Sequence, residues 1–460
     1  MTVKRILSLI IAFALSVTAF SSFAFADETP DPDITASSAI VIHLDSGTVL
    51  FEKNSDKRVS VAFLAKIMTV ILALENIDDL NTLITVPALP FYRENDKLTE
   101  GERIKAIDLI HCIMLATSNN ACYVIATHIC ESEEAFVDMM NKRAAELGAT
   151  DTLFTNSNGV VKGNKESPED FSADGVQHTT ASDAAKIVTH ALTIERFIDV
   201  NAAEGKRETV TFEEIADTVF YKIAKTNKQA ARNIYSSNRF RLGNDELFSS
   251  SVSGIKTSGN YLGDSICSVK EATLNGLGKQ RLLCITMFSE RGEALYNDTN
   301  RLWSYCFSNY RYVKLVGEGQ IAKTVKVKLG SNTDKVNLIS TSEVSGFIFG
   351  EYSRDKLEYK GVVPEYVTAP ISKGETVCAF EIVYDGKSYG TVEFAAAASV
   401  TRDELDYLFA QISDFFSSIY VKIFSILIFL AIALYIGYAV FYNKKKKRAR
   451  AKKVRNRFRF

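Results

Sequence analysis

Apolar positions with helical spacing stand out most clearly in residues 61–69, where an apolar run begins that continues through Leu74. The run contains neither Gly nor Pro, so we predict a buried helix. Lys66 is the one charge in the first two turns of that helix. Because an unpaired ammonium is costly to bury, Lys66 must contact polar groups or lose its proton. Lys66 is therefore a candidate site residue, unless it lies at the solvated edge of a surface helix.

Periodicity along residues 36–318 predicts an α+β domain. Alternating apolar runs predict strands, of which the first two flank the turn residues Asp45-Ser46-Gly47: 39–44, 48–52, 253–256, 265–272 and 282–288. Apolar residues at helical spacing predict further helices at 104–117, 121–129, 133–147, 180–192 and 293–311. Strands at both ends of the region, with helices between them, predict one sheet assembled from both ends of the domain.

The remaining third of the chain has a different pattern. Residues 322–398 contain only short alternating runs with turn signals such as Asp385-Gly386, and they predict a small all-β domain. Residues 403–420 carry apolar side chains on one helical face and predict an amphipathic linker helix. Residues 423–442 are twenty residues without a charge, which at about 1.5 Å per residue span the roughly 30 Å core of a bilayer. This stretch predicts a C-terminal transmembrane helix.

Both ends of the chain carry targeting signals. Residues 1–26 combine Lys4 and Arg5, an apolar run and a final Ala-Phe-Ala, which is the pattern of a secretory signal peptide. Residues 443–460 contain eleven Lys or Arg and no acid, which predicts a basic cytoplasmic tail. We therefore expect a single-pass protein of the cell membrane whose bulk is extracellular, on the cell-wall side.

Composition excludes two kinds of site. The formal net charge is −1, and removing the two positive charges of residues 1–26 and the eleven of residues 443–460 leaves about −14. Such an acidic ectodomain argues against a nucleic-acid partner. The five His have no metal-ligand spacing, and we predict neither a metal nor a cofactor. The seven Cys include no Cys-x-x-Cys pair and lie mostly in apolar runs, so we interpret them as core thiols.

Residues 38–54 and 61–69 together resemble the serine D-alanyl-D-alanine carboxypeptidases, the low-molecular-mass penicillin-binding proteins. In that family a helix begins Pro-Ala-Ser-x-x-Lys-x-Met-Thr, with the serine as nucleophile and the lysine, one turn later, as its base. Four residues of this chain match the pattern: Ala62, Lys66, Met68 and Thr69. Phe63 stands at the nucleophile position, so the resemblance implies that the attacking hydroxyl is missing.

Two further motifs of the family follow in order: Ser118-Asn119-Asn120 matches Ser-x-Asn, and Lys256-Thr257-Ser258-Gly259 resembles Lys-Thr-Gly, with Ser258 at the glycine position. The resemblance implies catalytic roles for Lys66, Ser118 and Asn120. It implies substrate binding by the four residues of the second motif: Lys256, Thr257, Ser258 and Gly259. A fixed cation and a hydroxyl suit a terminal carboxylate, which agrees with this assignment.

The resemblance also implies a fold. It predicts a β-lactamase/transpeptidase-like domain, with an antiparallel sheet and a helical subdomain, over residues 36–318. The small all-β domain over residues 322–398 then corresponds to the β-domain that follows the catalytic domain in many of these carboxypeptidases. The linker helix and the transmembrane helix complete the predicted order.

We expect a membrane-anchored pseudoenzyme that recognises peptidoglycan stem peptides ending in D-Ala-D-Ala, or that presents its fold to an envelope protein. Loss of a serine nucleophile typically removes about a million-fold in rate, because only binding and oxyanion stabilisation are left. Two alternatives stay open. The protein could be an active carboxypeptidase with a substitute nucleophile, for which Ser60 and Ser118 are the candidates, or an envelope scaffold that interacts through its β-domain.

Overall fold

The computed structural model describes residues 31–90, 97–160, 171, 175–201, 206–260 and 262–457. The predicted signal peptide, residues 1–26, lies outside these described residues, as do the last three residues of the predicted tail. The chain divides into two compact units, the N-terminal unit Met1–Tyr312 and the C-terminal unit Val313–Phe460.

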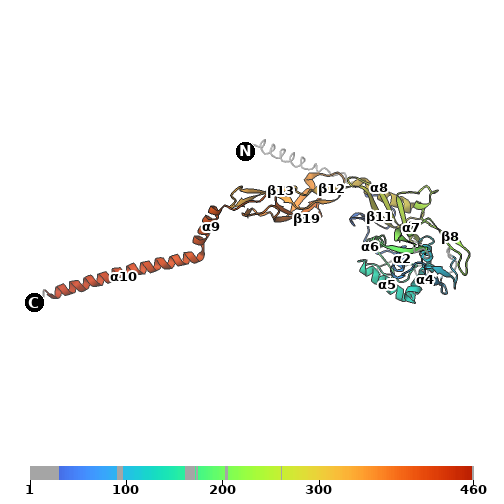
Figure 1. The fold of residues 1–460 in the computed structure, drawn as a ribbon, viewed down its shortest axis with the longest axis horizontal. Coiled ribbons are helices and arrows are strands. Elements are labelled where there is room, and N and C mark those ends of the chain that lie inside the picture. The colour runs from blue at the N-terminus through green and yellow to red at the C-terminus, as the bar shows by residue number, and fades with distance from the viewer. Residues whose placement is uncertain are drawn as a thin grey trace, which may run out of the picture. The chain divides into compact units, whose positions relative to one another are not determined.

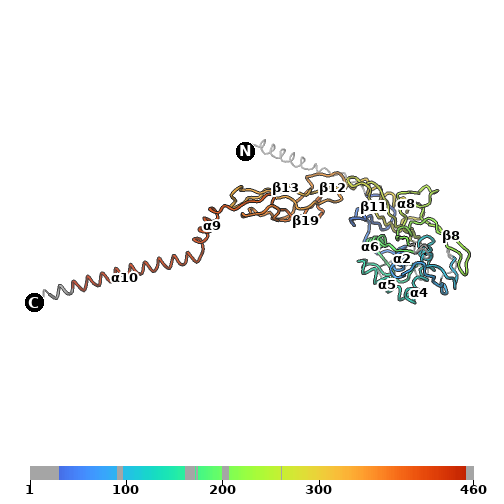
Figure 2. The backbone as a smooth tube through the Cα atoms, in the orientation of Figure 1, coloured from blue at the N-terminus to red at the C-terminus, as the bar shows by residue number. Residues whose placement is uncertain are grey.

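A five-stranded antiparallel sheet forms the centre of the N-terminal unit. Its order is β2 (Val49–Lys53), β1 (Ser38–His43), β11 (Gly278–Ser289), β10 (Gly263–Leu274) and β9 (Val252–Asn260). β1 pairs with β11 in the register Ile40↔Ile285, so strands from the two ends of the domain are neighbours. Figure 2 traces this closure, with the blue N-terminal hairpin beside β11. The predicted sheet assembled from both ends of the domain is confirmed.

Helices lie on both faces of this sheet. The described helices of the unit are α2 (Leu64–Asn76), α3 (Ala106–Met114), α4 (Asn119–Cys130), α5 (Glu133–Glu146), α6 (Ala181–Ala191), α7 (Phe212–Asp217) and α8 (Glu293–Asn309). Ile285 of β11 joins the core that contains α2 and α6, whereas its neighbour Thr286 hydrogen-bonds to Thr299 of α8 at 3.1 Å. Figure 1 shows α8 and α6 on opposite sides of β11. The α+β architecture with a helical subdomain is therefore as predicted.

α2 is buried along nearly its whole length, from Leu64 to Leu74. The apolar run starts at residue 61, but the helix begins three residues later. The reason is Ala62, whose φ of +45° lies in the left-handed region, through which a right-handed helix cannot continue. At the other end of the domain, α8 stops at Asn309 rather than at residue 311, because Tyr310 is extended and begins the next strand.

Three two-stranded sheets of this unit did not follow from the sequence: β3 (Leu83–Thr85) with β4 (Arg103–Lys105), β5 (Glu195–Asn201) with β6 (Lys206–Thr211), and β7 (Phe220–Ile223) with β8 (Arg232–Tyr235). β4 includes the first residues of the predicted helix 104–117, and that helix begins only at Ala106. The strands of the first and third of these sheets have only three or four residues, too few alternating positions for a period to emerge.

The C-terminal unit is built on the predicted all-β domain. One sheet has the order β16 (Leu357–Lys360), β18 (Thr376–Tyr384), β19 (Lys387–Ala396), β14 (Lys335–Ser340), β13 (Ile321–Lys328) and β17 (Tyr366–Thr368), and β12 (Tyr310–Val316) pairs with β15 (Val344–Phe349). Asp385 and Gly386 join β18 to β19 with φ values of +50° and +80°, the left-handed pair that a two-residue hairpin turn needs. The turn predicted at this dipeptide is confirmed.

Two helices follow the β-domain. α9 (Glu404–Ser417) starts after Asp403, whose carboxylate accepts hydrogen bonds from the amides of Leu405 and Asp406 and so caps the helix. α10 (Ile419–Arg457) comes next. Among the described residues, Ile419–Ala451 is long and apolar enough to cross a membrane, by length and composition. The predicted span 423–442 lies inside this one helix.

Candidate functional site

Lys66 lies in the first turn of α2, where it is buried among polar groups. Its Nζ donates to the Asn119 Oδ1 at 2.7 Å and to the backbone oxygen of Asn158 at 2.6 Å. The residue is only 6 % exposed. The requirement that a buried ammonium contact polar groups is therefore met, and the surface-helix interpretation of Lys66 is wrong.

Phe63 directly precedes α2 and is part of the main hydrophobic core. The residue is 0 % exposed, and its backbone oxygen accepts hydrogen bonds from the amides of Lys66 and Ile67. Ala62, before it, has the left-handed φ of +45°. A non-glycine residue in this region costs about 1–3 kcal/mol, and such strain is typical of functional sites. The bend that begins α2 is thus strained, but the side chain that it presents is a hydrocarbon ring.

A polar loop, residues 156–160, closes over the start of α2. Thr69 donates to the backbone oxygen of Ser157 at 2.6 Å, next to the Lys66 contact with Asn158. Gly159 has a φ of +81°, and a Cβ at this position would lie 2.9 Å from the backbone oxygen of Ala62. Only glycine fits this approach, so the loop packs directly against the strained turn.

Ser118 and its neighbours form the start of α4. The Ser118 Oγ accepts a hydrogen bond from the amide of Ala121 at 2.9 Å, so this residue is the helix N-cap. Asn120 is buried at 3 % exposure. Thr117, just before the cap, has a φ of +56°, a second strained non-glycine residue at this site. The structure thus brings the predicted Ser-x-Asn segment to Lys66, through Asn119.

Lys256 on β9 is also buried, at 2 % exposure. Its Nζ donates to the Thr117 Oγ1 at 2.8 Å. Burial, with a smaller contribution from the positive charge of Lys66, lowers the pKa of Lys256 to about 7. The two lysines are therefore close enough for the charge of Lys66 to act on Lys256.

The rest of the β9 motif is more accessible. Thr257 and Ser258 are half-buried on the last strand in the order of the sheet, and Thr257 Oγ1 shares a hydrogen bond of 3.0 Å with Ser237 Oγ. A Cβ on Gly259 would lie 2.4 Å from Asp264 Oδ1, so glycine lets β9 lie close to β10. Two hydroxyls therefore line the accessible edge of the site next to the buried Lys256, an arrangement that suits a carboxylate.

Both candidates for a substitute nucleophile are buried, each at 1 % exposure. The Ser60 Oγ is buried without a hydrogen-bond partner in the described part of the chain. The Ser118 hydroxyl caps α4. The described residues also contain no group of three or more His, Cys, Asp or Glu that could hold a metal.

Sequence reasoning missed four residues of this site: Thr117, Asn119, Asn158 and Ser237. Asn119 and Thr117 adjoin the Ser-x-Asn motif, so proximity in the chain was an available signal. Asn158 contributes a backbone oxygen, which leaves no mark in the sequence. The polar composition of its loop indicates only a connection between elements.

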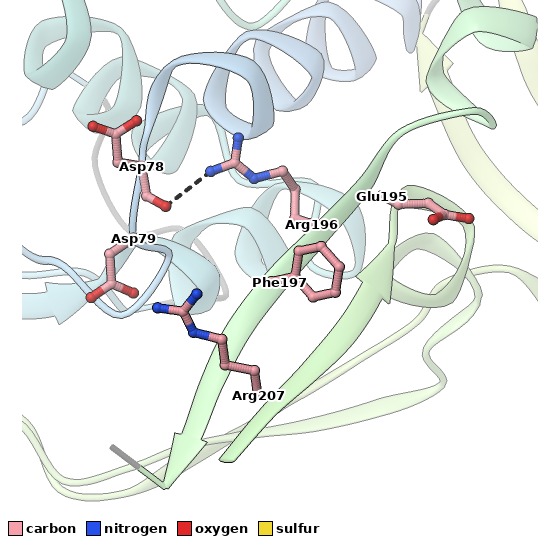
Figure 3. Close-up of a pocket in the computed structure, with 6 residues that line it drawn as sticks. All are labelled: Asp78, Asp79, Glu195, Arg196, Phe197 and Arg207. Carbon is pink, nitrogen blue, oxygen red and sulfur yellow. Dashed lines mark hydrogen bonds between the residues drawn. The ribbon is translucent and has the colours of Figure 1, made fainter. Parts of the chain in front are cut away.

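A separate cavity of about 410 Å³ lies at the opposite end of α2, and none of the predicted site residues lines it. It is lined by Asp78, Asp79, Glu195, Arg196, Phe197 and Arg207. The Arg196 guanidinium donates to the backbone oxygens of Ile77 and Asp78, and Figure 3 shows the second of these bonds. This arginine stabilises carbonyl groups just beyond the C-terminal end of the helix.

Most of this chain is similar to known proteins. Residues 25–237 match the family model "D-alanyl-D-alanine carboxypeptidase", and residues 310–402 match "Penicillin-binding protein 5, C-terminal domain". The D-alanyl-D-alanine carboxypeptidase DacF of Bacillus subtilis is 28 % identical over 87 % of this chain and 95 % of its own length. DacC of Escherichia coli is 27 % identical over 80 % of this chain and 86 % of its own.

Solved structures share the fold. The D-alanyl-D-alanine carboxypeptidase DacD from Francisella tularensis is similar with a TM-score of 0.57 and 17 % identity, over 84 % of this chain and 98 % of its own. Penicillin-binding protein 5 from Haemophilus influenzae is similar with a TM-score of 0.53 and 20 % identity, over 81 % of this chain and 99 % of its own. Two family models in this order, and relatives matched over most of their lengths, give the same answer: this chain is similar to the D-alanyl-D-alanine carboxypeptidases over most of its length.

Proposed function

We propose that this protein is an exported, membrane-anchored member of the family that binds the D-Ala-D-Ala ends of peptidoglycan stem peptides without hydrolysing them. The observation that carries the proposal is Phe63. A fully buried phenyl ring stands one helical turn before Lys66, at the position where the family pattern has its serine. A hydrocarbon has no lone pair with which to attack a carbonyl carbon, so no acyl-enzyme can form there.

The proposal assigns substrate binding to the other residues of the two motifs and of α2. In the proposal, Lys66, Ser118 and Asn120 are the counterparts of catalytic residues and frame the position of the scissile bond. Lys256, Thr257, Ser258 and Gly259 would line the peptide, with the cation and the Thr257 hydroxyl facing its terminal carboxylate. The half-buried edge of β9 supports this part, because a peptide needs access to it.

The proposal also covers the organisation of the chain. It comprises a signal peptide at 1–26, a carboxypeptidase-like domain at 36–318, a β-domain at 322–398, a linker helix at 403–420, a span at 423–442 and a basic cytoplasmic tail at 443–460. The long apolar helix α10 supports anchoring, because no charge interrupts its residues 423–442 and most of its basic residues follow them.

Two measurements on the purified full-length protein test the proposal. A labelled penicillin should leave no covalent label after denaturation. An acyl-D-Ala-D-Ala peptide should bind in calorimetry, and Lys256→Ala should weaken it roughly 10- to 100-fold, the range of one charge-assisted hydrogen bond. Lys270→Ala is the matched control, because Lys270 is a partly buried lysine of the adjacent β10 that lies outside the motif.

Each failure has its own meaning. Covalent labelling of the natural protein would mean that a substitute nucleophile acts, as in an active carboxypeptidase. Absence of peptide binding, with no label, would leave an envelope scaffold that interacts through its β-domain.

A second control changes the ligand. A peptide whose carboxylate is replaced by an amide should bind as weakly to the natural protein as the free acid does to Lys256→Ala.

A further inference from the structure

The β7–β8 hairpin exposes a pair of aromatic rings. Phe220 and Tyr235 are directly opposite each other in the hairpin, with ring centroids 5.4 Å apart. They are 49 % and 60 % exposed. Figure 1 shows β8 at the margin of the N-terminal unit. A cross-strand aromatic pair stabilises a hairpin only modestly, and large rings left in contact with water are a common feature of binding surfaces.

The opposite face of the hairpin is fixed to the domain. The Tyr221 hydroxyl donates to Asp108 Oδ1 at 2.7 Å, and its ring stacks on His111 with centroids 3.6 Å apart. On β8, Arg232 forms an ion pair of 2.8 Å with Glu102, whose side chain is 0 % exposed. The exposed pair is thus held on a rigid support, and a ligand that stacks on it loses little free energy in ordering the protein.

The hairpin leads directly into the candidate site. Tyr235 is two residues before Ser237, which hydrogen-bonds to Thr257 at 3.0 Å. Two residues span at most about 7 Å, so the backbone of Tyr235 lies close to the part of β9 proposed to hold the peptide carboxylate. An extended stem peptide of five residues reaches about 17 Å. A sugar ring joined to the far end of such a peptide is therefore within reach of the aromatic pair.

The chemistry of the exposed face suits a sugar better than a second peptide segment. The next pair on the same face is Lys222 and Asn233, both exposed. A pyranose ring has one face of C–H groups, which packs on aromatic rings, and a rim of hydroxyl and N-acetyl groups. An asparagine amide and a lysine ammonium beside the rings can hydrogen-bond to that rim.

We propose that Phe220 and Tyr235 form a stacking subsite for an N-acetylated sugar of the glycan strand whose stem peptide occupies the candidate site. This inference deepens the proposed function and rests on it for the peptide. The complete ligand is then a sugar-linked peptide, held at its carboxylate by the β9 motif and at its sugar by the hairpin.

Three probes separate the two parts of this ligand: a peptide-free oligosaccharide of N-acetylglucosamine, an acyl-D-Ala-D-Ala peptide, and a muropeptide that contains both. We expect Tyr235→Ala in the full-length protein to weaken muropeptide binding about tenfold, the scale of one aromatic contact, and to leave peptide binding unchanged. Phe197→Ala is the matched control, because this ring is 68 % exposed on the unrelated β5–β6 hairpin. Tyr235→Leu keeps apolar bulk and distinguishes lost stacking from a disturbed hairpin.

The outcomes are distinguishable. Oligosaccharide binding that Tyr235→Ala weakens supports the subsite even if the peptide alone does not bind, in which case the proposed function fails and the sugar site stands. Equal affinity for peptide and muropeptide, or no effect of Tyr235→Ala on either sugar-containing probe, overturns the subsite and leaves the peptide proposal untouched. If Tyr235→Leu binds the muropeptide as tightly as the natural protein, stacking is not the cause, and the inference is also wrong.

Discussion

The start of α2 and the edge strand β9 carry the two halves of the candidate site, and they differ in accessibility. Phe63 and Lys66 are 0 % and 6 % exposed, and a loop lies over them. Thr257 and Ser258 are half-buried on the last strand of the sheet. The half that would perform chemistry is therefore part of the hydrophobic core, whereas the hydroxyls of Thr257 and Ser258 are partly accessible, next to the buried Lys256. The proposed function, binding without turnover, rests on this difference.

The two halves also differ in what stabilises them. Ala62 and Thr117 adopt left-handed φ values, each of which costs about 1–3 kcal/mol. Burial of a phenyl ring stabilises by about 1.5–3 kcal/mol. At the start of α2 the ring of Phe63 thus offsets strain of similar size, which a serine hydroxyl could not do. The exposed edge of β9 has no comparable apolar contribution.

The largest expected effect comes from placing a serine hydroxyl at position 63, in the buried half of the site. Phe63→Ser should acquire a covalent penicillin label that the natural protein lacks, because loss of this nucleophile accounts for about a million-fold in rate. Denaturing gel electrophoresis after labelling measures the effect. Phe63→Ala is the control, since it removes the same ring without adding a hydroxyl and should stay unlabelled. A folded Phe63→Ser protein that binds the peptide but takes up no label would show that more than the oxygen has been lost.

The two halves should also differ in how much a truncated side chain destabilises the protein. Phe63→Ala leaves a cavity in the core and should lower the free energy of unfolding by about 3–5 kcal/mol, whereas Thr257→Ala should change it by less than about 1 kcal/mol. Denaturant titration can be followed by the single tryptophan, Trp303, which is buried in α8 and reports on the N-terminal unit. Similar losses for both variants would contradict the division into a buried and an accessible half.

The large elements of the fold can be predicted from the sequence because their apolar patterns repeat over many residues. Lys66 can also be identified there as a buried lysine, since a charge at the start of an apolar helix has to be paired with polar groups inside the protein. The β7–β8 hairpin was not predicted, because each strand has only four residues and the alternation of Phe220 and Tyr221 is too short to detect.

The candidate site could be predicted only in part. The motifs identify side chains, but they do not fix the orientation of those side chains. Asn119, between the two motif residues Ser118 and Asn120, contacts Lys66 through its side chain, and Asn158 contributes a backbone oxygen. A contact made by a backbone group cannot be identified from residue types. Whether Asn119 or Asn120 points toward Lys66 depends on the geometry of α4, which begins after its N-cap, Ser118.

The smallest expected effect comes from pH and concerns Lys256, the buried residue of the β9 motif. Burial lowers the pKa of Lys256 from its usual 10.5 to about 7. Below pH 7 the lysine is protonated in both the folded and unfolded states. Between about pH 7 and 10.5 the unfolded state holds a proton that the folded state lacks, so this group makes stability rise with pH in that window.

Ligand binding should follow the opposite trend. A bound carboxylate favours protonated Lys256, so peptide binding above pH 7 must take up a proton, and affinity should fall between pH 6 and 8.5 by at most about tenfold per pH unit. Calorimetry at several pH values measures the trend. Lys256→Met removes the titrating amine and should flatten the profile, whereas a slope that persists in this variant would assign it to another group. A flat profile in the natural protein would mean that the carboxylate is held by the hydroxyls of β9 without the cation.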